Sequence, residues 1–407
     1  MPGRQAHGRP LIAADGGGKG KNKRSKAKAS SKAMNAYAAA QAEVGEQQKR
    51  TPRFRQLDAD LDDGEPRKHA RDDEDDEDDD EGSCAGSKVK NLIVFGDSYT
   101  DEGRLAYFLG SGGIPPPPGT VIPIANITAS GGHAWPYYAS QKLGATTYNY
   151  AVSGAVCSNE IVSRFIENFA FPSVIDYEVP AFKADVKYAS STPNATFLRD
   201  RTPGNTVYAL WIGTNDLGNG GFLLEKQVPG KTTSDYIDCI WSAFDGIYST
   251  GGRRFALFTQ VPLEVSPLYA AIGNGGAGNG PFWLNKTAYN TAEYESKILQ
   301  YTTTVNTIYD YGVPFQFFLR KRWPGASFII FNTHQIILDI KNNPKKYLDA
   351  PANATSYYTS PDTDSQSPRS GFLWYDELHP SSRTDEIIGK EFAKALDGDS
   401  PYATYHS

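Results

Sequence analysis

The chain has few cysteines, no long apolar run and no marked excess of charge of either sign. None of its apolar stretches reaches the roughly 18 residues that a membrane-spanning helix needs, so the sequence predicts no membrane span. Its three cysteines, Cys84, Cys157 and Cys239, allow at most one intrachain disulfide and leave both the pairing and the compartment open. The formal net charge is −6, and the part after residue 83 is mildly acidic. It offers no basic face for nucleic acid.

Residues 1–85 differ in composition from the rest of the chain. A basic stretch at 19–32 is followed by an unbroken acidic run at 72–81. Because blocks of like charge with few large apolar residues bury too little surface to offset chain entropy, we expect a disordered low-complexity tail here and a folded domain over 86–407. Three interpretations of the tail stay open: a nuclear or nucleic-acid contact, a solvated tail without a partner, and a segment joined by gene prediction.

The signals for localisation point in different directions. The sequence does not begin with a basic region followed by an apolar run, so we expect no secretory signal peptide. Four N-x-[ST] sequons nevertheless suit a secreted glycoprotein, although each is also compatible with an unmodified surface asparagine; they are Asn126, Asn194, Asn285 and Asn353. We therefore expect an extracellular protein whose leader is missing from this sequence.

From residue 88 onward, aromatic-rich apolar runs alternate with helical patterns. The runs are short, continuous and bounded by turn residues, which is typical of strands buried on both faces; they cover 91–97, 146–152, 206–213, 253–261 and 327–332. Helices are predicted at about 236–248, 288–311 and 381–396. This alternation predicts a single α/β domain whose five-stranded parallel sheet carries helices on both faces. Reactive groups are then expected beyond the carboxyl ends of the strands.

Polar motifs follow three of the predicted strands. Gly96, Asp97 and Ser98 end the first strand, where a serine on a strand-to-helix turn is exposed and nearby N–H groups can stabilise an anion, although both Asp97 and Ser98 also suit a helix N-cap. Gly154 follows the second strand, where its backbone N–H can approach an oxyanion or the glycine can simply serve a turn.

The motif Gly213-Thr214-Asn215-Asp216 follows the third predicted strand. The Asn215 side-chain amide is a candidate donor toward developing negative charge, while Asn and Asp also serve as helix caps. Gly213 and Asp216 are the supporting residues of this motif.

Asp376 and His379 precede the last predicted helix, three residues apart. A histidine that acts as a general base needs a carboxylate to fix its tautomer and stabilise its charged form. A structural histidine or half of a metal site is the alternative. Since no second histidine with ligand spacing lies nearby, we expect no metal.

Taken together, the order Ser98, Gly154, Asn215 and Asp376-x-x-His379 resembles the GDSL, or SGNH, hydrolase family over roughly residues 89–396. The resemblance implies a flavodoxin-like three-layer α/β/α sandwich and a serine ester hydrolase without a cofactor. Ser98 would be the nucleophile, His379 the general base and Asp376 its orienting carboxylate. The oxyanion hole would comprise the backbone N–H groups of Ser98 and Gly154 with the side chain of Asn215.

The segments FGDSYTDEGR and AVSGAVCSN are similar to fungal family 16 carbohydrate esterases, which act as acetylesterases. This likeness implies an enzyme that removes acetyl or other short acyl groups from small-molecule or oligosaccharide esters, including hemicellulose-derived ones. We also expect a monomer. A lipase or phospholipase acting on lipid esters is the alternative, as are an inactive carbohydrate-binding relative and a nuclear interaction protein. Trp135, Trp283 and Trp374 are candidate sugar-stacking surfaces or, individually, ordinary core residues.

Overall fold

A computed structural model describes residues 88–166 and 169–407. The predicted tail at 1–85, with Cys84, lies outside these residues, so the proposed domain boundary stays a prediction. The described strands and helices have the following bounds: β1 Asn91–Gly96, α2 Arg104–Gly110, α3 Trp135–Leu143, β2 Thr146–Asn149, β3 Phe165–Ile166, β4 Phe169–Ala170, α4 Val179–Ser191, β5 Thr206–Trp211, α5 Thr214–Leu217, α6 Thr233–Tyr248, β6 Arg254–Phe258, α7 Thr291–Pro314, β7 Ser327–Phe331, α8 Thr333–Asn342, α9 Pro344–Tyr347, β8 Asn353–Tyr357, β9 Phe372–Trp374, α10 Ser382–Leu396 and β10 Ala403–His406.

The central sheet has the strand order β10-β7-β6-β5-β1-β2. Strands β2, β1, β5, β6 and β7 are parallel, as predicted, and β10 pairs antiparallel with β7. The parallel strands therefore follow the flavodoxin-like order, which confirms the predicted fold class. The sixth strand was not predicted, because four residues at an edge carry almost no pattern of their own.

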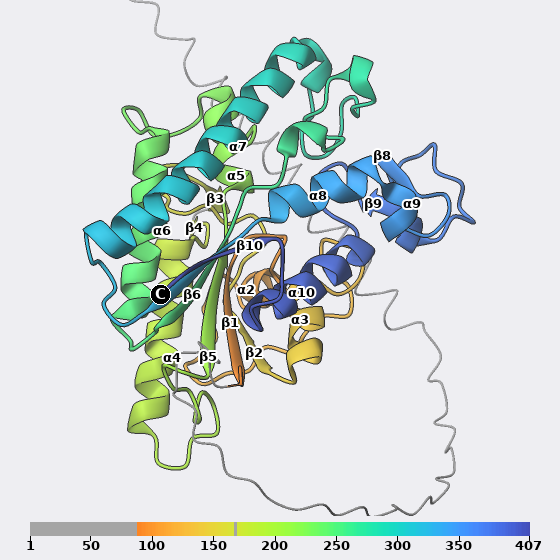
Figure 1. Ribbon diagram of the computed structural model, residues 1–407. Coiled ribbons are helices and arrows are strands. Elements are labelled where there is room, and N and C mark those ends of the chain that lie inside the picture. Colours follow the sequence, from red (N-terminus) through yellow and green to blue (C-terminus); the bar gives the residue numbers. More distant parts are fainter. Residues whose placement is uncertain (1–87, 167–168) are drawn as a thin grey trace, which may run out of the picture. The chain divides into compact units, whose positions relative to one another are not determined.

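Helices cover both faces of this sheet (Figure 1). Helices α4, α6 and α7 lie on one side and α3 and α10 on the other, with α3 packed against α10. Each layer is filled by aromatic side chains: Phe95 stacks on Tyr150 toward α4, while Trp135 packs between Phe258 and Phe392 toward α10. The two faces of the sheet are thus buried by separate apolar layers. Because both faces are buried, the sequences of these strands are continuous apolar runs.

Strand β2 differs from the prediction of a long strand buried on both faces. It ends at Asn149, and its residues are exposed or half-buried because β2 forms the edge of the sheet. The buried residues 150–152 follow the strand and lead into the loop that carries Gly154. The N–H groups of Tyr150 and Val152 still donate to the carbonyls of Val94 and Gly96 on β1, at 2.8 and 3.0 Å, so the chain stays beside β1 as far as this loop.

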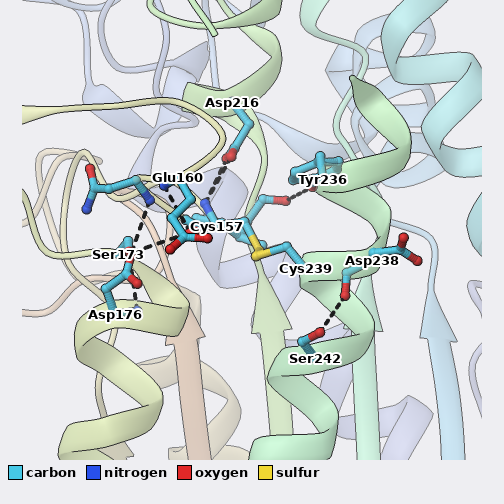
Figure 2. Close-up of a disulfide and its surroundings, with 12 residues drawn as sticks. Cys157, Glu160, Ser173, Asp176, Asp216, Tyr236, Asp238, Cys239 and Ser242 are labelled. Atoms are coloured by element: carbon cyan, nitrogen blue, oxygen red, sulfur yellow. Dashed lines mark hydrogen bonds between the residues drawn. A yellow bond between two sulfur atoms is a disulfide. The ribbon is translucent and has the colours of Figure 1, made fainter. Parts of the chain in front are cut away.

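A disulfide between Cys157 and Cys239 ties that loop to α6 (Figure 2). The two cysteines are 82 residues apart in sequence. In the chain-entropy view, a cross-link over a loop of this length stabilises a fold by about 2–5 kcal/mol, because it restricts the unfolded chain. Of the pairings that the sequence left open, this one anchors the segment between β2 and α4 to the helical layer.

Candidate active site

Ser98 lies on a tight turn directly after β1. Gly96 ends the strand at φ 146°, and a side chain there would overlap the carbonyl oxygen of Trp211 on the neighbouring strand β5. The Gly96 N–H donates to the buried carboxylate of Glu178 at 2.9 Å. The Asp97 carbonyl then accepts the N–H groups of Thr100 and Asp101, which turns the chain and places Ser98 at the carboxyl end of the sheet.

Asp97 supports this turn from beneath. Its Oδ1 accepts the Tyr99 N–H at 3.1 Å, and its other oxygen is buried. Burial raises the pKa of Asp97 to about 6, because removing a carboxylate from water disfavours its charge. Neither Asp97 nor Ser98 caps a helix, so the N-cap interpretation of this motif was wrong; the first following helix, α2, begins at Arg104.

A continuous hydrogen-bonded array joins Ser98, His379 and Asp376. The Ser98 Oγ lies 2.8 Å from His379 Nε2, and His379 Nδ1 lies 2.8 Å from Asp376 Oδ2. Asp376 Oδ1 also accepts the backbone N–H groups of Leu378 and His379, at 2.9 and 2.7 Å. Three donors thus hold this carboxylate against the imidazole.

The segment that carries Asp376 and His379 is a tight loop after β9. Tyr375 N–H donates to the His379 carbonyl at 2.8 Å, and Trp374 forms a bridge to Pro380. The Tyr99 hydroxyl, next to Ser98, donates to the Leu378 carbonyl at 2.9 Å. The Ser98 turn and the loop of Asp376 and His379 are therefore connected by the Tyr99 hydroxyl as well as by the array itself.

The loop around Gly154 is held by side chains from several elements. Gly154 adopts φ 91°, and a Cβ on it would lie 2.9 Å from the Phe171 ring. Asn215, at the start of α5, donates through Nδ2 to the Ala155 carbonyl at 2.9 Å. Gly154 and Asn215 are both half-exposed, so each remains open to a ligand. The structure therefore brings the second and third motifs together at one edge of the sheet.

Gly213 and Asp216, on either side of Asn215 in sequence, make buried contacts that hold Asn215 and the Gly154 loop in place. Gly213 has φ 134°, and a side chain there would overlap the hydroxyl of Tyr236 on α6. The buried carboxylate of Asp216 accepts the Cys157 N–H at 2.9 Å (Figure 2). Burial raises the pKa of Asp216 to about 7. Asp216 is thus a partner of the loop backbone rather than a cap for its own helix.

Two residues that the motif analysis missed also hold this loop. Asp101 accepts the Ser153 N–H at 2.7 Å and the N–H groups at the start of α2, so one carboxylate connects the Ser98 turn, the helix and the Gly154 loop. Arg164 donates to the Gly154 carbonyl and lies over the Phe171 ring at 5.1 Å. The N-cap preference for Asp before a helix was the sequence signal that could have found Asp101; Arg164 had none.

The three candidate stacking tryptophans are core residues. Trp135 and Trp374 are fully buried, and Trp283 is 3% exposed. Their rings are packed against neighbouring protein, so they offer no face to a sugar. That interpretation was wrong for all three. Two other rings contact the His379 imidazole: Tyr99, at a centroid distance of 5.8 Å, and Phe282, at 5.4 Å.

The four sequon asparagines differ in their exposure to solvent. Asn126, Asn194 and Asn285 are exposed, whereas Asn353 is half-buried and accepts the Ser356 N–H at 2.8 Å.

Within residues 88–166 and 169–407, no group of three or more His, Cys, Asp or Glu side chains could hold a metal ion. Over the same residues, no helix has the length and apolar character needed to cross a membrane.

Comparison with known proteins places this site in a family. Residues 92–392 match the GDSL-like lipase/acylhydrolase family. An acetylesterase from Hypocrea jecorina is 46% identical over 324 residues, which cover 78% of this chain and 91% of that protein. An acetylesterase from Thermothelomyces thermophilus is 26% identical, with 76% and 89% covered. A solved structure of a family two carbohydrate esterase from Clostridium thermocellum is 11% identical over 76% of this chain and 63% of that one, at a TM-score of 0.33. The chain belongs to the GDSL-like lipase/acylhydrolase family and is a carboxylic ester hydrolase.

Proposed function

We propose that this protein is a serine esterase that removes acetyl and other short acyl groups from carbohydrate esters. The observation that carries the proposal is the array Ser98–His379–Asp376, whose two hydrogen bonds to the imidazole are both 2.8 Å long. Such an array activates a hydroxyl that would otherwise be a weak nucleophile. The acetylesterase relatives support acetyl as the acyl group.

In the proposed mechanism, His379 Nε2 takes the proton from Ser98 as Oγ attacks the ester carbonyl carbon. Asp376 holds Nδ1–H and stabilises the imidazolium that forms. The imidazolium then gives its proton to the leaving alcohol, which departs and leaves an acyl-enzyme on Ser98. Water, deprotonated by His379, attacks this acyl group and releases the carboxylic acid and free Ser98.

The oxyanion of both tetrahedral intermediates would be held by the Ser98 N–H, the Gly154 N–H and the Asn215 amide. The hydrogen bond from Asn215 Nδ2 to the Ala155 carbonyl orients this amide and leaves a second N–H on the same nitrogen. The contacts of Asp101 and Asp216 to the loop keep its donors in place before the substrate arrives. Donors that are fixed in advance need no reorganisation as charge develops.

Asn215→Ala is expected to lower kcat on acetyl esters by about 10²–10³-fold with little change in KM, because the missing donor acts on charge that exists only in the transition state. Steady-state kinetics on p-nitrophenyl acetate measures both constants. The matched control is Asn343→Ala, a change at the end of α8 on an exposed residue whose side chain donates to the Asp339 carbonyl of that helix. An unchanged kcat for Asn215→Ala removes this residue from the proposed oxyanion hole.

We also propose that the protein is secreted, glycosylated and monomeric. The Cys157–Cys239 disulfide supports an oxidising compartment, because disulfides persist mainly outside the cytosol. The exposed positions of Asn126, Asn194 and Asn285 support glycosylation. Mass spectrometry of protein purified from its source, with and without glycosidase, tests the glycosylation.

The substrate class is tested by a hydrolysis profile at equal concentrations of acetyl, butyryl and long-chain esters and of acetylated xylo-oligosaccharides. We expect the highest kcat/KM on acetyl esters and clear release of acetate from the oligosaccharides. Preference for long-chain esters would contradict the proposal and favour the lipid-ester alternative. The array itself would be compatible with either substrate, since it acts on the ester group alone.

A further inference from the structure

The segment Gly280-Pro281-Phe282-Trp283 forms a tight turn beside the array. Gly280 and Trp283 exchange backbone hydrogen bonds of 3.3 and 3.2 Å, with Pro281 at the second position, where its restricted φ favours a turn. A side chain on Gly280 would overlap the carboxylate of Glu377, the residue next to Asp376. The turn therefore lies directly against the loop that holds Asp376 and His379, and a side chain on Gly280 would require Glu377 to move.

The turn is anchored on both sides of Phe282. The Trp283 ring is buried among tyrosines and lies 5.4 Å from Tyr289 and 5.8 Å from Tyr294. Asn219, in the loop after α5, donates to the Phe282 carbonyl at 2.8 Å. With its own carbonyl and the following residue fixed, Phe282 presents its ring to His379 from a rigid support.

Phe282 is the solvent-facing member of the two rings that contact the imidazole. Tyr99 is 2% exposed and its hydroxyl is engaged with the Leu378 carbonyl. Phe282 is half-buried and meets His379 edge to face, at 5.4 Å and 66°. Part of this ring is therefore available to a molecule that approaches His379 from solution.

The chemistry of the reaction says which part of the substrate reaches this ring. His379 Nε2 must protonate the leaving alcohol, so the alcohol oxygen has to come within about 3 Å of that nitrogen. The acyl group, in contrast, must sit at Ser98 Oγ and the oxyanion donors. A ring that packs on the imidazole thus borders the alcohol side of the ester rather than the acyl side.

We propose that Phe282 forms the alcohol subsite and selects carbohydrate alcohols by packing its ring against the C–H groups of a sugar. This inference rests on the proposed function and names its specificity-determining residue. A flat apolar ring gives a pyranose contact area and orientation, whereas a small alcohol such as ethanol hardly reaches it. Trp283, the candidate next to it in sequence, instead anchors the turn.

The test varies the alcohol while the acyl group stays acetyl. Phe282→Leu keeps apolar bulk beside His379 but removes the flat ring. We expect kcat/KM on acetylated xylo-oligosaccharides to fall about 5- to 10-fold more than kcat/KM on ethyl acetate, mainly through KM. Phe282→Tyr and Phe282→Trp should keep the preference for the oligosaccharide. Phe315→Leu is the matched control, because Phe315 is 45% exposed directly after α7 and packs under Arg320.

The ratio of the two kcat/KM values decides the outcome. If Phe282→Leu keeps the wild-type ratio, the inference is overturned, whether or not the two kcat/KM values change. An equal fall in both values would mean that the ring only shields His379. Loss of the preference in Phe282→Trp would also overturn it, and this variant still reports if Phe282→Leu fails to fold. Failure of the proposed function shows separately, as wild-type protein that releases no acetate from the oligosaccharides.

Discussion

Replacing Ser98 by alanine is expected to lower kcat/KM on acetyl esters by about 10⁴- to 10⁶-fold, because the proposed mechanism forms the acyl-enzyme on Ser98 Oγ. Removing the nucleophile of such an array costs about as much as removing the whole array, since its members act as a unit. The residual rate should reflect the oxyanion donors and substrate binding alone. Initial rates on p-nitrophenyl acetate, with enzyme concentrations high enough to detect the residual activity, measure the loss.

The fold should not change in Ser98→Ala. Ser98 Oγ bonds His379 Nε2, and the turn itself is held by backbone contacts of Asp97. We expect the thermal unfolding midpoint to stay close to that of the wild type. Ser242→Ala is the control: this serine is exposed on α6 and bonds the Asp238 carbonyl of its own helix (Figure 2). Full esterase activity in Ser98→Ala would contradict the proposed serine mechanism.

The second large effect is expected at Asp376. Asp376→Asn should lower kcat by about 10⁴-fold with KM changed far less, because an amide in this position favours the wrong imidazole tautomer and cannot stabilise the imidazolium. The shape of the side chain is kept, and its oxygen can still accept the N–H groups of Leu378 and His379. The loss would therefore report on charge and tautomer rather than on a collapsed loop.

A matched control for this change is Asp362→Asn, an exposed carboxylate in the segment between β8 and β9. It should hydrolyse p-nitrophenyl acetate at the wild-type rate. If Asp376→Asn retains more than about a tenth of the wild-type kcat, Asp376 does not perform the role assigned to it, given the usual effect of losing this carboxylate. A crystal structure of the variant would show whether the 2.8 Å contact to Nδ1 is kept.

The sheet was largely predictable from sequence because its strands are buried on both faces. Continuous apolar runs at β1, β5, β6 and β7 marked these strands to within three residues at each end. The edge strands were less readable. The predicted strand at 146–152 was longer than β2, which ends at Asn149 although Tyr150 and Val152 still donate N–H groups to β1, and the short β10 carried no signal.

Positioning residues were the hardest part of the site to predict. Asp101 reaches the Gly154 loop from the turn that carries Ser98, and Arg164 reaches it from the segment before β3; no sequence spacing relates these partners. The aromatic residues show the same limit. Trp283 and Phe282 are neighbours in sequence, yet the turn buries one ring and leaves the other half-exposed beside His379.

By itself, the sequence determined the fold class and the order of the motifs, because burial pattern and residue type are local properties. It also predicted that Ser98, Gly154 and Asn215 gather at one edge of the sheet, since parallel strands end on the same side. The place of Asp376 and His379 beside them was implied only by the family resemblance. The tertiary structure alone decided the 2.8 Å contacts of His379, the pairing of Cys157 with Cys239 and the exposure of Phe282. These depend on how distant segments pack, which no local pattern encodes.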